Sequence, residues 1–265
     1  MKNRIFYSQM NHDQEQARKN RSDDNAQPKY RDVKGHLLAG ELFPNYPDIL
    51  LNTLLFILCC LPSMVMVILF LMTGGLIFAA GFVASMILTV PAMAALYHRC
   101  FSYIRYTPAF VRKSFFTAFR SCFRQGAPCG LVLGILWVLL GFYSLVGQSQ
   151  TEIQPFFYYA VVYLCLIVVN YFTITVTAQI AQFMLSTQAV LKNGVLLLFL
   201  CGWRGAVPAV LQTLYITLLL QKPSAGMLLL FLGAPGVIFT IAAHFLWPRL
   251  SGILLVLPDE NHDSD

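Results

Sequence analysis

Long apolar runs, separated by short polar or basic stretches, dominate the pattern of this chain. Each run approaches the roughly 20 residues that an α-helix needs to cross a bilayer. The pattern predicts an all-α, polytopic membrane protein of about six transmembrane helices within residues 47–248. The predicted spans cover about residues 48–70, 76–97, 128–146, 155–177, 206–220 and 227–247.

The two ends of the chain differ from this apolar region. Residues 1–46 are polar and mixed in charge, and their first 35 residues lack a regular apolar period, so they predict a largely disordered tail. Residues 249–265 form a second, acidic tail. The chain therefore divides into a polar tail, a transmembrane domain and a C-terminal tail.

A basic segment between the second and third spans predicts a helix over residues 108–125. Thr107-Pro108 is a good helix start, and Gly126-Ala127-Pro128 is a good stop. Its phenylalanines share one broad face at helical spacing, and its cations gather on the flank of that face. This pattern is typical of an amphipathic helix in the headgroup plane. The cations expected to contact lipid or a partner there are Lys113, Arg120 and Arg124.

Residues 194–220 allow two interpretations. They form either one long helix with Arg204 inside it, or an interfacial segment followed by a span that starts near Ala206. A shift of 80 residues places 107–131 over 187–211 with six identities, among them Arg124 with Arg204. A true repeat would be a parallel one, made of a two-span hairpin followed by a surface helix. It favours the second interpretation, with Arg204 at the interface.

The basic residues set the expected orientation. Eight of the 18 lie before residue 35 and six lie in 98–127, and two predicted spans separate these groups. By the positive-inside rule both groups lie in the cytoplasm. We therefore expect a multi-pass protein of the cell membrane with both termini cytoplasmic.

Composition agrees with a lipid environment. Charged residues make up 11% of the chain, against about 25% in an ordinary soluble domain. The net charge of +6 sits beside apolar spans, so anionic lipid headgroups are the expected partner rather than nucleic acid.

The fourth predicted span is the most polar one. Asn170, Thr173 and Thr177 lie three and four residues apart, so they share one helical face. Such a stripe either bonds to its own helix and to neighbouring helices, or lines a solute path. The second interpretation predicts a small transporter or channel.

The sequence gives little sign of catalysis. Glu152 is the one acidic residue between Asp48 and Asp259, so a hydrolytic triad or carboxylate relay has no acid within the spans. Nucleotide and zinc-protease motifs are missing, and the seven cysteines form no C-x-x-C. We expect no enzyme activity, no cofactor and no metal site.

Three stretches carry a family resemblance. They are LLNTLLFILCCLP (50–62), TVPAMAALYHRC (89–100) and FVRKSFFTAFRSCFRQG (110–126). Together they resemble the YesL-like family of bacterial integral membrane proteins, mainly over residues 50–130. The chain departs from the family pattern at Val90, where glycine is usual, and in its long spacing between Pro62 and Thr89.

The resemblance implies a role but no site residues. This largely uncharacterised family is often associated with bacterial carbohydrate uptake and degradation. It implies a non-enzymatic accessory protein whose partner is a sugar-uptake permease. No coupling-loop motif of the Glu-Ala-Ala type is evident, which disfavours a permease subunit proper.

Overall fold

A computed structural model describes residues 38–104, 111–148, 155–183 and 185–254 of the chain. These residues form helices without strands, which confirms the all-α class. Five of the helices are long and apolar enough to cross a membrane, and a bent pair, α8 and α9, supplies a sixth candidate. The helices are α2 (Leu38–Thr73), α3 (Leu76–Ile104), α4 (Val111–Gln148), α5 (Pro155–Gln182), α6 (Thr187–Cys201), α7 (Trp203–Gln221), α8 (Pro223–Phe231) and α9 (Ala234–Leu254).

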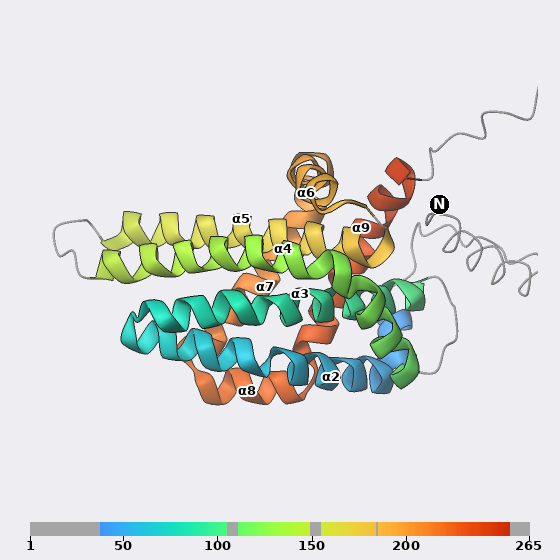
Figure 1. The fold of residues 1–265 in the computed structure, drawn as a ribbon. Helices are drawn as coiled ribbons and strands as arrows, with labels where there is room; N and C mark the ends of the chain where they lie inside the picture. The colour runs from blue at the N-terminus through green and yellow to red at the C-terminus, as the bar shows by residue number, and fades with distance from the viewer. Residues whose placement is uncertain (1–37, 105–110, 149–154, 184, 255–265) are drawn as a thin grey trace, which may run out of the picture. The chain divides into compact units, whose positions relative to one another are not determined.

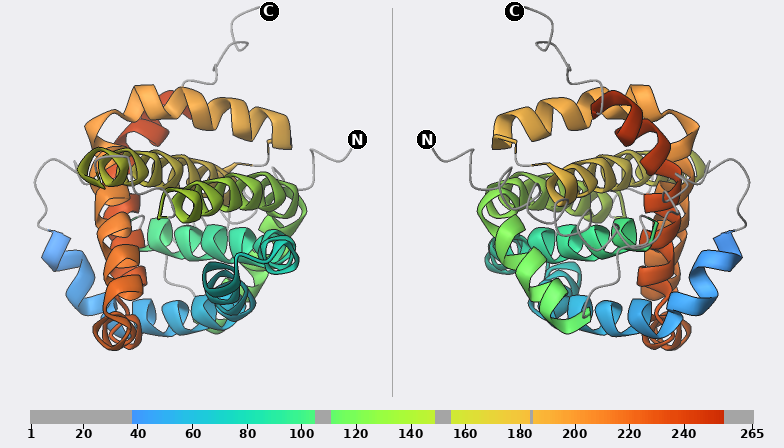
Figure 2. Two further views of the ribbon diagram at one scale, coloured as in Figure 1. Left: turned by 90° about the vertical axis from the view of Figure 1, so that its left-hand side faces the viewer. Right: turned by 90° about the vertical axis from the view of Figure 1, so that its right-hand side faces the viewer.

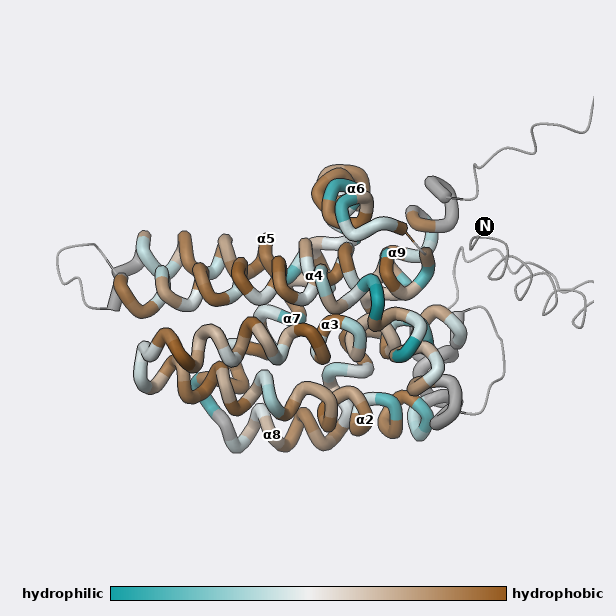
Figure 3. Tube along the Cα trace, in the orientation of Figure 1, coloured by the Kyte–Doolittle hydropathy of each residue, from teal (hydrophilic) through white to brown (hydrophobic). Residues whose placement is uncertain are grey.

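Helix α3 is the centre of the packing. It contacts α2, α4, α5 and α9, and its second half is almost entirely buried. In Figure 1, α2, α3, α4 and α5 run alongside one another across the picture, whereas α6 is seen end-on and so lies across them. The tube in Figure 3 is brown along most of the long helices, as expected for helices that face lipid and each other.

The predicted helix 108–125 is not a separate element. It is the first part of α4, which begins at Val111 and runs without a break into the third span. The expected stop fails because Pro128 removes a single backbone donor, and neighbouring helices can accommodate that loss in a membrane protein. The helix bends instead, and Figure 1 shows its green first part turned away from the rest. Residues 105–110, including the expected cap, lie outside the described residues.

Residues 194–220 contain a break, as the second interpretation predicts. Gly202 has a φ of 50°, which ends α6 at Cys201 and lets α7 start at Trp203. Figure 2 shows α6, in gold, running across the top of the other helices. The last predicted span is also divided, since α8 and α9 meet at an angle of 66° around Gly233.

The observed ends of the domain differ from the expected ones. Helix α2 already begins at Leu38, so the last residues of the expected 1–46 tail are helical, and α9 continues past residue 249 to Leu254. The remaining parts of both tails, 1–37 and 255–265, lie outside the described residues.

The predicted repeat has a counterpart in the helix contacts. Helix α3 packs on α4, and 80 positions later α5 packs on α7. Gly126 of α4 faces Pro91 of α3, and Gly205 of α7 faces Tyr171 of α5. Pro91 and Tyr171 are 80 positions apart, while the two glycines are 79 apart. These parallel contacts agree with a repeat, which stays a prediction.

Three glycines let α4 approach α3 closely. Gly126, Gly130 and Gly134 recur every fourth residue, so they lie along one face of α4. A Cβ atom at Gly126 would lie 2.9 Å from Cγ of Pro91, and one at Gly134 would lie 3.1 Å from Cα of Val83. A Cβ at Gly130 would meet the backbone carbonyl oxygen of Met86. The backbones therefore touch along this face.

Candidate functional site

The predicted polar stripe of α5 is buried between helices. Asn170 has no exposed surface, and Thr173 and Thr177 are equally buried. Thr173 Oγ1 donates to the carbonyl of Val169 at 2.8 Å, and Thr177 Oγ1 donates to that of Thr173 at 2.7 Å. Trp137 Nε1 on α4 donates to Thr173 Oγ1 at 3.4 Å. Two of these bonds stay within α5 and the third joins α5 to α4, as the first of the two interpretations expects.

Asn170 connects α5 to α7. Its Nδ2 donates to Thr213 Oγ1 at 2.9 Å, and that hydroxyl donates its own proton to the carbonyl of Ala209 at 2.8 Å. Because the threonine proton is already used, the amide must present its nitrogen to Thr213. The buried Asn170 Oδ1 then has no hydrogen-bond partner among the described residues. This oxygen is the open acceptor of the stripe.

We expect Asn170 and Thr213 to be coupled energetically. Thr213→Val removes the acceptor of Asn170 Nδ2 and leaves a buried donor unmet, which costs about 1–3 kcal/mol. In an Asn170→Leu background the same substitution should cost less, by about 0.6–1.7 kcal/mol. Unfolding of the four proteins of this cycle in mixed micelles of mild detergent and SDS measures the difference. Strictly additive costs would contradict the bond.

The predicted basic contacts fall on two helices. Arg120 and Arg124 are exposed on the first part of α4, next to the exposed ring of Phe116. Lys113 belongs to α4, but its side chain lies outside the described residues. Arg204 is half-buried in the first turn of α7, with its Cζ 5.8 Å from the centre of the Trp203 ring. Figure 3 shows a hydrophilic stretch on the first part of α4. The expected cations with described side chains are therefore accessible or half-accessible.

Arg99 is the residue that sequence reasoning misplaced. The second span is predicted to end at about residue 97, which places Arg99 just beyond it, but α3 continues to Ile104 and Arg99 is 2% exposed. The signal was present in the spacing, because Arg99 shares a helical face with the small or apolar Ala92, Ala95 and Leu96. An ionisable side chain buried in a span is a functional-site hypothesis by default.

His98 differs from the buried Arg99 in its exposure. Its side chain is exposed, and its Nδ1 lies 3.2 Å from the carbonyl oxygen of Ala181 on α5. This contact joins the ends of α3 and α5 on the side where the basic segment follows. Within the part of the chain that the structure describes, His, Cys, Asp and Glu form no group of three or more that could hold a metal ion.

Comparison of the chain with protein-family models, with curated proteins and with solved structures finds no match.

Proposed function

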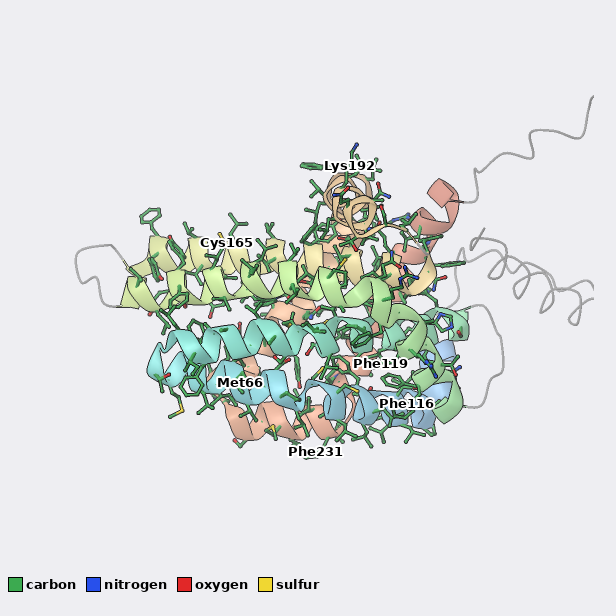
Figure 4. The ribbon with its side chains drawn as sticks, viewed as in Figure 1. Met66, Phe116, Phe119, Cys165, Lys192 and Phe231 are labelled. Carbon is green, nitrogen blue, oxygen red and sulfur yellow. The ribbon has the colours of Figure 1, made fainter. Side chains whose placement is uncertain are left out.

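We propose that this chain is a non-enzymatic accessory protein of a bacterial carbohydrate-uptake system. It lies in the cell membrane as a multi-pass protein with both termini in the cytoplasm. The observation that carries the proposal is the first part of α4, which presents Arg120 and Arg124 beside exposed Phe116 and Phe123. Figure 4 labels Phe116 in this region. Exposed aromatic and arginine side chains together are typical of protein interfaces.

The resemblance supplies the kind of partner. A sugar permease is a membrane protein with cytoplasmic loops, and a basic aromatic helix beside the membrane is well placed to meet it. The net positive charge of the segment would favour an acidic surface on the permease.

Uptake and co-purification test this proposal. Deletion of the gene should lower uptake of at least one labelled oligosaccharide, and a plasmid copy should restore it. The tagged full chain, extracted in mild detergent, should retain permease subunits. Arg120→Gln with Arg124→Gln should weaken this retention, while the control Lys222→Gln should not. Unchanged uptake of every sugar tested would rule the proposal out.

The transporter interpretation stays as a second candidate because of Asn170 Oδ1. This buried oxygen has no hydrogen-bond partner among the described residues, so it is able to accept a hydrogen bond from a solute or a water. Proteoliposomes that contain only this chain distinguish the candidates. If the chain is a transporter, these proteoliposomes should take up the labelled sugar, and Asn170→Leu should abolish the uptake. If the chain is an accessory protein, they should show no uptake.

A further inference from the structure

Helix α6 is too short to cross the membrane and is seated on α5. Its 15 residues span about 22 Å, against about 30 Å for the hydrocarbon core. Val190, Gly194, Leu197 and Cys201 form its buried face. Thr175 Oγ1 of α5 lies 3.4 Å from the Gly194 carbonyl oxygen, and a Cβ at Gly194 would lie 2.9 Å from Val176. The two helices therefore cross in close contact.

Both ends of α6 are fixed. Ser186 caps its first turn by accepting a hydrogen bond from the Ala189 backbone N–H at 3.3 Å. At the other end, Tyr171 Oη of α5 donates to the carbonyl of Gly202 at 3.0 Å. Gly205 has no side chain to keep the Tyr171 ring away. These contacts therefore fix the position of α6 across α5.

The outer face of this junction is apolar and exposed. Phe199 is 80% exposed, Trp203 is 65% exposed, and Leu196 also faces outward. On α5, the exposed Leu164 and Val168 lie on the same helical face as the contact with α6. Large apolar side chains exposed in this number are unfavourable in water, and Leu164 and Val168 belong to a candidate membrane span.

Two cations lie on the same side of the junction as these apolar side chains. Lys192 is exposed and extends from α6 away from the other helices (Figure 4). Arg204 lies at the start of α7 beside Trp203. The sequence has no acidic residue between Glu152 and Asp259, so neither cation is matched by a nearby acid along the chain. The positive charge of Lys192 and Arg204 therefore favours contact with an anionic surface.

The depth of α6 matches that of a membrane-surface helix. It crosses α5 at Thr175, and seven residues separate this position from the end of α5 at Gln182. At 1.5 Å per residue this places α6 about 10 Å inside the end of the span. Interfacial helices bury their apolar face about 5–10 Å into the boundary between headgroups and acyl chains.

We propose that α6 and the start of α7 form an in-plane anchor that binds anionic lipid headgroups through Lys192 and Arg204. Phe199 shares the outward face of α6 with Lys192, seven residues earlier, so Phe199 and Trp203 contact acyl chains while the long Lys192 side chain extends toward the headgroups. The anchor belongs to the leaflet on the side of His98 and the basic segment. It is independent of the accessory role proposed above, because it requires a lipid and no protein partner.

The fluorescence of Trp203 can report which lipids surround this anchor. The full chain with Trp137→Phe and Trp247→Phe keeps Trp203 as its one tryptophan. It is reconstituted in nanodiscs of phosphatidylcholine and phosphatidylglycerol, with one or the other lipid brominated high on its acyl chains. At equal mole fraction, brominated phosphatidylglycerol should quench Trp203 more strongly. Lys192→Gln with Arg204→Gln should remove this preference. The control Lys222→Gln, which changes a cation between α7 and α8, should preserve it.

A second measurement needs no tryptophan substitutions. Native mass spectrometry of the full chain should show retained phosphatidylglycerol, with fewer bound molecules for the Lys192→Gln, Arg204→Gln variant than for Lys222→Gln. Equal quenching by both lipids, or equal retention by all variants, overturns the proposal. Quenching of Trp203 by aqueous acrylamide but by neither brominated lipid also overturns it. Cross-linking of a Phe199→Cys variant between two chains would overturn it as well, because the exposed face would then belong to a contact with a second copy.

Discussion

Gly130→Ala should destabilise the protein, although alanine is the better helix former. The substitution gains up to about 1 kcal/mol in helix propensity. Its new Cβ, however, meets the backbone carbonyl oxygen of Met86, and backbone cannot rotate away as a side chain can. Overpacking of this kind costs about 1–3 kcal/mol. The overlap is with backbone, so we expect the upper part of that range and a net loss in SDS unfolding.

Gly81→Ala is the matched control for this prediction. Gly81 lies in α3, and a Cβ there would lie 2.9 Å from the sulfur of Met66, at the flexible end of a side chain. Met66 can adopt another rotamer, so the propensity gain should prevail and stability should be unchanged or higher. If both substitutions have the same effect, close backbone contact does not hold α4 on α3.

Arg99→Ala should cause a loss of about 2–5 kcal/mol, the range of large-to-alanine substitutions in cores. Arg99 is among the largest fully buried side chains of the described residues, so its removal leaves a cavity at the centre of the packing. Thermal unfolding in detergent and unfolding in SDS both report this loss. Arg120→Ala is the control, because Arg120 is exposed on α4 and surface substitutions stay within about 0.5 kcal/mol.

Arg99→Met separates volume from charge. Methionine fills much of the same space without the guanidinium, so it keeps most of the packing that alanine loses. We expect its unfolding free energy to lie closer to that of the native protein than the alanine variant does. A methionine variant as unstable as the alanine variant would mean that the charge itself holds the site.

Several features were predictable from local pattern. The apolar runs predicted the helical membrane class because each run must satisfy its own backbone hydrogen bonds in lipid. The break near Gly202 was one of two interpretations of residues 194–220, and the spacing of Asn170, Thr173 and Thr177 predicted a shared face. These features depend on residues within a few turns of one another.

Other features required the partner helix. Gly126-Ala127-Pro128 is a good stop in isolation, yet α4 continues through it, with Gly126 packed against Pro91 of α3. His98 and Arg99 look alike at the end of an apolar run, yet one is exposed and the other buried. Position on the helix decides this, because the face that Arg99 occupies is covered by the helices around α3.

The sequence by itself therefore determined that the chain forms apolar helices with a strongly basic segment between two of them. Lipid demands long apolar runs, and that demand can be read one segment at a time. Only the tertiary structure decided that the polar stripe of α5 is buried between helices, that Arg99 is buried, and that α6 lies across α5. These facts depend on which helix faces are neighbours, and hydropathy is nearly the same on every face of a membrane helix.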